Sequence, residues 1–449
     1  MTAQARKGRG EASPAAQGKE RQATEQPVSW LELFFDLVFV TAFDRLAQRL
    51  LAHPDLPTFG VFALMFVALW WAWLGNTNFA ARYGNACRPY RWGTLAQMLT
   101  LAALAVSVRG ALSDVGAFFA LGYAANRTIL VVMLVLRGRE ELGRREEGQL
   151  SPGDRTLALG FTVGAALWVA SAWLGGTAQL VLWGVALALD LACVLYTEAR
   201  YDRETPHQGH FPERVGLLLI VFLGAVVTEL IRGAAEQRLR PAEQVPAALA
   251  FLTIMAIWRL YFDEAHTLPA LLAERSGRVG TLLAWAYTHL PLTLALSVLS
   301  VGFGLGIAEA GAEADRHERL LVGAALAVIF VSLVLLRFFS VRPLNAGTVA
   351  PVPVRPALSL SSVARLVGAA LVLLLIAAPV STTRYQAACA LITLGVAYAS
   401  WRDPVREALN QLEDRLSDES EAEASEDAQP AAGPSAGDSG KSPEEGEAS

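Results

Sequence analysis

The sequence predicts an all-α fold: a polytopic transmembrane bundle of about twelve helices, with a two-fold internal repeat of six-helix units. Three observations predict it. Of the 449 residues, 53% are hydrophobic and the mean hydropathy is +0.37; apolar segments of membrane-spanning length recur along the chain; and the two halves share a weak sequence match. A water-soluble globule of this composition would expose large apolar patches, whereas a multi-pass membrane protein places the same residues in lipid.

The individual helices follow from apolar stretches separated by short polar breaks. A helix needs about 20 apolar residues to cross a hydrocarbon core of about 30 Å, and strands are the poorer interpretation at these lengths. The first pair and the last pair are joined by such short links that each pair could be one bent hairpin, which would lower the count by one or two. The stretches are 30–52, 57–75, 92–112, 116–136, 157–174, 178–196, 214–232, 245–263, 280–305, 320–340, 362–380 and 385–401.

Composition divides the chain into four parts. Residues 1–27 form a polar, basic, cytoplasmic N-terminal segment without the apolar core and cleavage site of a signal peptide. Residues 28–200 and 201–402 are the two membrane halves, and residues 403–449 are an acidic cytoplasmic tail with 14 acidic and 3 basic residues. From about Ala408 the tail has too few apolar residues to offset the entropy cost of ordering, so we expect it to be disordered.

Basic residues indicate the orientation of the bundle, because Arg and Lys in short loops are retained on the cytoplasmic side. With the N-terminus inside, and with residues at helix ends counted in the adjoining loop, cytoplasmic segments hold 24 basic residues and external loops hold 7. The loop with Arg232, Arg238 and Arg240 is an exception. The count predicts that both termini are cytoplasmic.

The two halves align weakly with each other. Glu32, at the start of the first helix, aligns with Glu213, at the start of the seventh, and the run 97–102 (Gln-Met-Leu-Thr-Leu-Ala) aligns with 290–295 (Leu-Pro-Leu-Thr-Leu-Ala). Transporter folds are often built from such repeats. Six helices per half would make the two units parallel, related by an axis along the membrane normal.

Two local patterns concern helix packing and depth. The segment Gly160-Phe-Thr-Val-Gly164 in the fifth helix is a small-xxx-small face that would let another helix approach closely. Most tryptophans, such as those at 30, 70, 71, 73 and 401, fall near predicted helix ends. That placement is typical of an aromatic belt at the membrane surface.

The segment Trp30-Leu-Glu-Leu-Phe-Phe-Asp-Leu-Val-Phe-Val40 resembles the opening signature of the bacterial low-temperature-requirement A family. Further landmarks are Trp70-Trp-Ala-Trp-Leu-Gly, the run from Leu95, His210-Phe-Pro-Glu-Arg-Val-Gly and Trp285-Ala-Tyr-Thr-His-Leu-Pro291. The resemblance covers most of residues 28–400 and implies a multi-helix protein of the bacterial inner membrane. The family often carries an acidic residue after the glycine of the seventh helix. Here Ala225 follows Gly224, and Glu229 is the candidate replacement.

The first candidate site is a pair of carboxylates, Glu32 and Asp36, which are four residues apart and therefore share a helix face. Two carboxylates that close in poorly hydrated surroundings cannot comfortably both ionise. One interpretation is a proton-sharing site, as a proton-coupled carrier needs. The other is an interfacial pair that is wetted by headgroups and matched by arginines from a loop.

Other ionisable residues inside predicted helices are also candidates, because a charge in the bilayer is costly unless it is paired. Asp44 and Arg45 are adjacent, so they do not face each other and each needs another partner. Arg127 and Asp190 lie midway along their helices and could form a buried cross-helix ion pair, either functional or fold-specifying. The remaining candidates are Glu213, Glu229 and His289. His289 precedes Pro291, where a titrating histidine at a helix kink and a hydrogen-bonded core histidine are both open.

No metal site, cofactor or nucleic-acid partner is predicted. The three cysteines are far apart, Gly302-Phe-Gly-Leu-Gly306 lacks the preceding strand and the lysine of a phosphate loop, and no nucleophile is paired with a base. The chain is therefore not expected to be an enzyme. The expected partners are the lipid bilayer and an unknown small solute or ion, and a homo-oligomer is left open.

These observations favour a proton-coupled secondary transporter or permease, in which two six-helix units frame a site near the membrane midplane. The alternative is a non-transporting membrane protein with an envelope sensing or structural role. A polar, water-reachable cavity at Asp36, Asp44 or Asp190 would favour the transporter. Tight, dry pairing of the same groups would favour the structural role.

Overall fold

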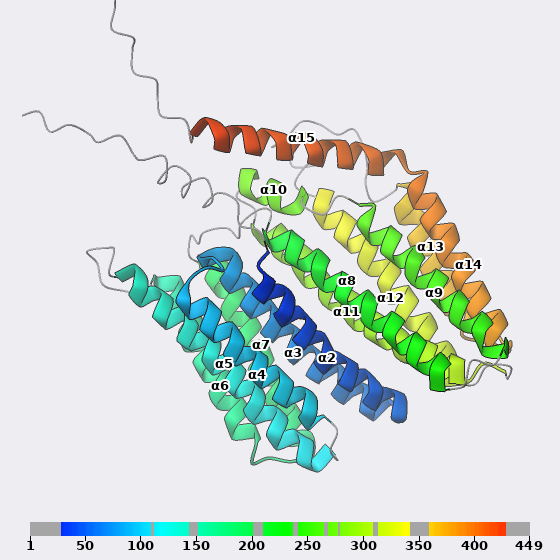
Figure 1. Cartoon of the computed structure of the whole chain (residues 1–449), viewed down its shortest axis with the longest axis horizontal. Helices are drawn as coiled ribbons and strands as arrows, with labels where there is room; N and C mark the ends of the chain where they lie inside the picture. The colour runs from blue at the N-terminus through cyan, green and yellow to red at the C-terminus, as the bar shows by residue number, and fades with distance from the viewer. Residues whose placement is uncertain are drawn as a thin grey trace, which may run out of the picture. The chain divides into compact units, whose positions relative to one another are not determined.

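The computed structural model describes residues 28–108, 112–142, 151–200, 210–236, 241–264, 268–276, 279–308, 313–341 and 359–427. In these ranges all regular structure is helical, apart from one isolated β-bridge between Glu313 and Ser381, so the all-α prediction is confirmed. The helices are α2 (Trp30–Ala52), α3 (Leu56–Tyr83), α4 (Arg88–Ser107), α5 (Leu112–Leu142), α6 (Pro152–Ser171), α7 (Gly176–Arg200), α8 (His210–Glu236), α9 (Pro241–Phe262), α10 (Leu268–Ser276), α11 (Val279–Ala308), α12 (Arg316–Val341), α13 (Leu360–Leu375), α14 (Thr382–Trp401) and α15 (Pro404–Asp427) (Figure 1).

Several helices begin and end at local signals in the sequence. Ser29 caps α2 in a capping box with Glu32, and the Asp55 side chain accepts a hydrogen bond from the backbone N–H of Thr58 at the start of α3. The α3 helix ends at Gly84, whose φ of 85° lies in the left-handed region that glycine adopts without strain. These caps fix where the polar ends of α2 and α3 lie.

Seven of the described helices are long and apolar enough to cross a membrane. They are α3, α7 and α12 together with the segments Gly116–Arg139, His210–Ala235, Gln244–Phe262 and Gly280–Ala308. Of the rest, α2 contains five charged residues and α13 has only 16 residues. The chain is therefore built as a multi-pass membrane protein with several apolar helices.

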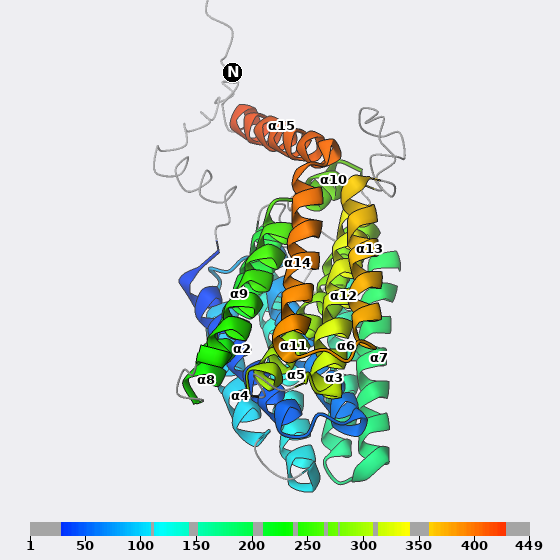
Figure 2. The same cartoon turned by 90° about the vertical axis from the view of Figure 1, so that its right-hand side faces the viewer.

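Neighbouring helices follow the same order in both halves of the chain. In the first half α2 packs on α3 and α4, and α4, α5, α6 and α7 pack in sequence; in the second half α8 packs on α9 and α11, and α11, α12, α13 and α14 pack in sequence (Figures 1 and 2). The short helix α10, which was not predicted, precedes α11. The halves meet where α2 and α3 pack against α8 and α11. We call the contact between α2 and α8 the α2–α8 seam.

The acidic tail corrects one prediction. Disorder was expected from Ala408, but α15 runs to Asp427, so that prediction is wrong for this stretch. The Asp403 side chain accepts a hydrogen bond from the backbone N–H of Val405, and Val405 and Leu409, one turn apart, are both buried. A short apolar stripe therefore anchors the helix start despite the acidic composition. Residues 1–27 and 428–449, predicted as a basic cytoplasmic segment and a disordered tail, lie outside the described residues.

Candidate functional site

The charged residues at the start of α2 and α8 meet at one end of the α2–α8 seam. Nη1 of Arg214 lies 2.8 Å from Oε1 of Glu32, and Nη2 lies 2.9 Å from Oδ1 of Asp36. Nε2 of His210 is 2.9 Å from the same Glu32 oxygen. Both helices present these residues at a spacing of four, so that each pair shares one helical face. The result is a buried ion-pair cluster that joins the two halves of the chain.

Neutral groups add further hydrogen bonds to the two carboxylates. Oε2 of Glu32 accepts from the backbone N–H of Ser29 at 2.7 Å, from the Ser29 hydroxyl at 2.9 Å and from the Asn85 amide at 3.0 Å. Nε1 of Trp73 donates to Oδ1 of Asp36 at 2.8 Å. The cluster is buried and closely packed, which strengthens each hydrogen bond in it.

The shared face of Glu32 and Asp36 is as predicted, and of the two interpretations left open the headgroup-wetted interfacial pair does not match their surroundings. Both side chains are buried rather than wetted by headgroups, and their arginine, Arg214, comes from a helix and not from a loop. The arginine was visible in the sequence, inside the motif that begins at His210. Because Arg214 lies at the end of a predicted helix, it was counted with the basic residues of the adjoining cytoplasmic loop.

A ladder of uncharged polar side chains continues from this cluster into the first half. The Tyr90 hydroxyl donates to Oδ1 of Asn76 at 3.3 Å, and the Asn76 amide donates to Thr94 and Gln97. Gln97 in turn donates to Asn126 on α5. Because every one of these groups needs a partner in an apolar interior, the ladder fixes how α3, α4 and α5 pack.

A second charged cluster lies farther along the same seam. The carboxyl groups of Asp44 on α2 and Glu229 on α8 lie close enough to interact. Gln48 donates to Asp44 at 2.7 Å and accepts from Arg45 at 2.9 Å, while Nε of Arg232 donates to Glu229 at 3.0 Å. Asp44 and Arg45 are thus both bound by Gln48 of the same helix, whereas their adjacency had predicted a separate partner for each. Two carboxyl groups in contact can share one proton.

Arg127 on α5 and Asp190 on α7 form a buried cross-helix ion pair, as the sequence predicted. Nη2 of Arg127 lies 2.8 Å from Oδ2 of Asp190, and both side chains are 1% exposed. The guanidinium also stacks over the Phe161 ring, 4.4 Å from its centroid. The pairing removes the cost that either charge alone would have in an apolar interior.

The small-residue face of α6 explains how α7 comes so close. A Cβ on Gly164 would lie 2.5 Å from Oδ1 of Asp190, and one on Gly160 would collide with the Cys193 sulfur. Both glycines are therefore required for the observed packing, and the predicted close helix approach is confirmed. The tryptophan prediction is wrong for 70, 71 and 73, which are buried, whereas Trp30 and Trp401 are exposed. Tyr287 from the second half packs against both Trp70 and Trp71.

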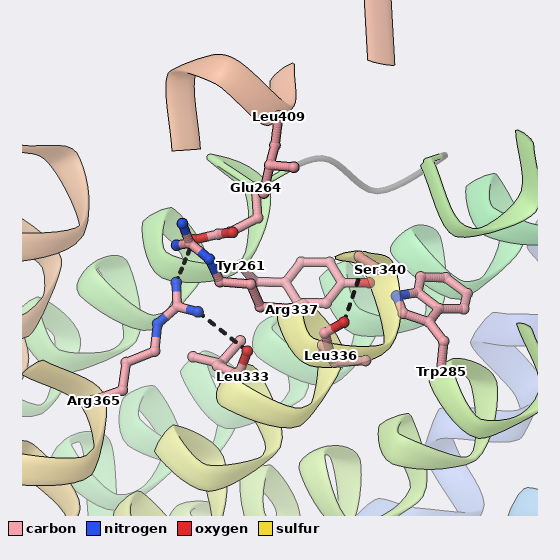
Figure 3. A pocket seen from close by; sticks show the side chains of 9 residues that line it. All are labelled: Tyr261, Glu264, Trp285, Leu333, Leu336, Arg337, Ser340, Arg365 and Leu409. Atoms are coloured by element: carbon pink, nitrogen blue, oxygen red, sulfur yellow. Dashed lines mark hydrogen bonds and ion pairs between the residues drawn. The ribbon is translucent and has the colours of Figure 1, made fainter. Parts of the chain in front are cut away.

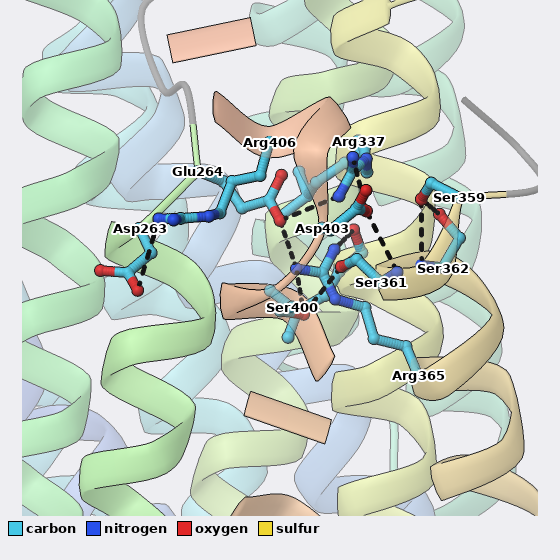
Figure 4. A network of polar contacts seen from close by, with 12 residues as sticks. Asp263, Glu264, Arg337, Ser359, Ser361, Ser362, Arg365, Ser400, Asp403 and Arg406 are labelled. Carbon is cyan, nitrogen blue, oxygen red and sulfur yellow. Dashed lines mark hydrogen bonds and ion pairs between the residues drawn. The ribbon is translucent and has the colours of Figure 1, made fainter. Parts of the chain in front are cut away.

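A third cluster, missed by sequence reasoning, holds the second half together (Figure 4). Nη2 of Arg365 lies 2.5 Å from Oε1 of Glu264, Nη1 of Arg337 lies 3.3 Å from the same oxygen, and Nη2 of Arg337 lies 3.0 Å from Asp403. Both arginines are 1% exposed or less. Two cations and two carboxylates balance, and they connect the end of α9 with α12, α13 and the start of α15.

A small cavity of about 20 Å³ lies beside this cluster (Figure 3). It has room for about one water molecule. Figure 3 shows the Arg365 guanidinium between Glu264 and the backbone carbonyl of Leu333, to which it donates at 3.1 Å. The third cluster thus stabilises the packing of these helices, and the cavity beside it is too small for a solute.

Two further candidates lie apart from the charged clusters. Glu213 is exposed on α8, next to the buried Arg214. His289 is buried in α11, where Nε2 is 2.9 Å from the Tyr261 hydroxyl and Nδ1 is 3.0 Å from the Trp285 carbonyl oxygen. The helix continues through Pro291 to Ala308. The geometry is that of a hydrogen-bonded core histidine, one of the two interpretations left open.

Comparison with known proteins identifies the family of the chain. Over 301 residues the chain is 25% identical to an uncharacterized protein of Rhizobium meliloti (strain 1021), an alignment that covers 63% of this chain and 70% of that protein. No solved structure matches the chain significantly. Residues 27–399 match the family described as bacterial low temperature requirement A protein (LtrA). This match spans α2 to α14 almost completely, and the chain therefore belongs to the LtrA family.

Proposed function

We propose that this LtrA-family protein is a proton-coupled secondary transporter of the bacterial inner membrane, with both termini in the cytoplasm. The α2–α8 seam is the observation that carries the proposal. It holds a cluster of buried ion pairs at one end, around Arg214, and a contact between two carboxyl groups, Asp44 and Glu229, toward the other. At this seam, ion pairs would hold the two halves together and a carboxyl pair would take up and release a proton. A proton-coupled carrier needs both functions.

The proposal includes twelve membrane crossings arranged as two six-helix units related by a two-fold repeat. The equal order of neighbouring helices in the two halves supports the repeat, with α2 corresponding to α8 and α7 to α14. Repeats of this kind place the transported solute between the units, near the midplane. Twelve crossings require five more membrane helices besides the seven apolar ones, namely α2, α4, α6, α13 and α14. Their polar residues can lie in the membrane because they pack inside the protein.

In the proposed mechanism, proton uptake and release take place where Asp44 and Glu229 meet in the α2–α8 seam. Asp44 is half-buried and Glu229 is 6% exposed, and their contact is favourable when one of them carries a proton. When that proton leaves, two like charges face each other across the seam and push α2 and α8 apart. At the other end of the seam Arg214 binds both Glu32 and Asp36, and in the proposed mechanism these ion pairs keep that side closed.

The non-transporting alternative has its own support. Asp36 and Asp190 are each paired with a buried arginine, which is what a structural role would require. It differs from the proposal in one respect that can be measured. A structural protein needs no movement of protons with a solute, whereas a proton-coupled carrier moves both together.

The test is a proton-flux assay with purified protein in liposomes that contain a pH-sensitive dye. A panel of small solutes is added outside, and a solute-dependent pH change inside identifies coupling. Asp44→Asn should abolish this flux, while Asp55→Asn, on an exposed helix cap nearby, should leave it unchanged. Flux that is absent for every solute, or that survives Asp44→Asn, would reject the proposal.

A further inference from the structure

A surface groove of about 610 Å³ runs between α4 and α5, two helices that pack side by side (Figure 1). On α4 its lining extends from Arg88 to Ala96, and on α5 from Thr128 to Arg139. On each helix the lining residues recur at intervals of three or four, so one continuous face of each helix borders the groove. We call it the α4–α5 groove. Its volume is in the range of about 300–1,000 Å³ that small-molecule sites have.

The middle of the groove is apolar and accessible from outside the bundle. Trp92, Val132 and Leu136 are 73%, 48% and 41% exposed, and the buried Met133 forms the floor. Gly93 makes room for this floor, because a Cβ at that position would collide with the Met133 sulfur. Exposed apolar side chains on a helix that can cross the membrane, as α5 can, face lipid chains.

One end of the groove is positively charged. Arg88 begins α4 and Arg139 lies in the last turn of α5, so the antiparallel packing of the two helices brings both arginines to the same end. Both side chains are exposed, and none of the described residues that line the groove is acidic. The positive end of the α4 dipole also lies here. This end of the bundle is the one that the basic-residue count predicts to be cytoplasmic.

The groove has the depth of one lipid leaflet. Arg88 and Ala96 are eight residues apart, and Thr128 and Arg139 are eleven apart. At a rise of about 1.5 Å per residue these stretches are about 12–16 Å long. Half of a hydrocarbon core of about 30 Å is about 15 Å. A lipid with its phosphate at the two arginines would therefore lay one acyl chain along the whole groove.

We propose that the α4–α5 groove binds one anionic phospholipid, with its phosphate at Arg88 and Arg139. One acyl chain lies against Trp92, Val132 and Leu136. Guanidinium groups match phosphate oxygens in forked pairs, and basic pockets between membrane helices recognise anionic head groups. A soluble anion would leave the apolar part unused, and a zwitterionic lipid would bring a second positive charge to the arginines. The site goes beyond the proposed function, since lipid binding does not depend on transport.

Native mass spectrometry of the purified protein in detergent counts bound lipids directly. Phosphatidylglycerol, which is anionic, should bind about fivefold or more tightly than phosphatidylethanolamine with identical acyl chains, which is zwitterionic. Arg88→Gln and Arg139→Gln should each weaken phosphatidylglycerol binding about fivefold, and the double variant about 25-fold. Arg91→Gln removes the same charge from an exposed position on α4 outside the groove, and it should leave binding unchanged.

A second variant tests the apolar part of the site and keeps both arginines. Val132→Trp fills the groove and should lose most of the phosphatidylglycerol binding, whereas Val185→Trp, on α7 and 50% exposed, should retain it. Glycerol phosphate, a head group without chains, should not displace the lipid. Equal binding of the two lipids, an equal loss with Arg91→Gln, wild-type binding by Val132→Trp, or displacement by glycerol phosphate would overturn the inference. An unchanged thermal transition without added lipid shows that each variant is folded.

Discussion

Arg214 follows Glu32 by 182 residues, yet its Nη1 atom lies 2.8 Å from Oε1 of Glu32. The same guanidinium binds Asp36 through Nη2. One side chain from the second half of the chain thus pairs with both carboxylates in the most recognisable segment of the first half, at one end of the α2–α8 seam.

Removing this arginine should destabilise the protein strongly. Arg214→Gln leaves two buried carboxylates without their cation, a change that costs about 3–5 kcal/mol. Glu213→Gln, at the exposed neighbouring position, should change stability by about 0.5 kcal/mol or less. The thermal transition and the monodisperse yield of both variants in detergent measure this difference. Equal behaviour of the two variants would show that Arg214 is not a principal contact between the halves.

The pair of Arg127 and Asp190 should show coupling. Asp190→Asn alone leaves Arg127 as a buried, uncompensated cation, whereas Asp190→Asn combined with Arg127→Gln leaves none. We expect the single variant to lower the yield in the membrane more than the double variant does. Equal losses would mean that the two residues do not interact, since a double-mutant cycle measures their interaction energy.

Much of this arrangement was visible in the sequence, for definite physical reasons. Apolar stretches identify helices because lipid demands internal backbone hydrogen bonds. Charged residues in the middle of a membrane helix, such as Arg127 and Asp190, require a partner of opposite charge. The sequence therefore predicted that these two residues pair with each other. The spacing of Glu32 and Asp36 fixed their common face.

The remaining features depend on how the halves pack, which one sequence does not reveal. The partner of Glu32 is Arg214 because α2 and α8 meet, not because of any local pattern. Arg337 and Arg365 were recognisable as arginines inside predicted helices, but their carboxylate partners, Glu264 and Asp403, follow helix ends, where solvation was the simpler explanation. The start of α15 was not predicted because the segment is acidic overall, and its two buried apolar residues, Val405 and Leu409, were not recognised as a helix face.

The glycine face of α6 should tolerate no side chain. Gly164→Ala places a Cβ 2.5 Å from Oδ1 of Asp190, so the ion pair or α7 must shift, at a cost of about 1–3 kcal/mol. Gly184→Ala on α7 has no atom within 4 Å of the new Cβ and should cause no loss of stability. The comparison uses the thermal transition of the two variants. A Gly164→Ala protein as stable as Gly184→Ala would show that α6 and α7 are not in this close contact.

The orientation can be tested with fused reporters. Reporters placed after Arg145 and after Arg402 should give a cytoplasmic signal, because basic residues are concentrated in these segments. A reporter inserted in the 309–317 loop should report the outside. A cytoplasmic signal from that loop would be incompatible with twelve crossings.

The central claim is that the proton of the α2–α8 seam resides on the pair formed by Asp44 and Glu229, and not on Glu32 and Asp36, where Arg214 already supplies positive charge. Infrared titration of the purified protein tests it most directly, because a protonated carboxyl group has a separate absorption band. The account predicts a band that persists near neutral pH, that Asp44→Asn and Glu229→Gln each remove, and that Asp36→Asn leaves in place. A band that survives Asp44→Asn but disappears in Asp36→Asn, or the absence of any band in the wild type, would contradict it.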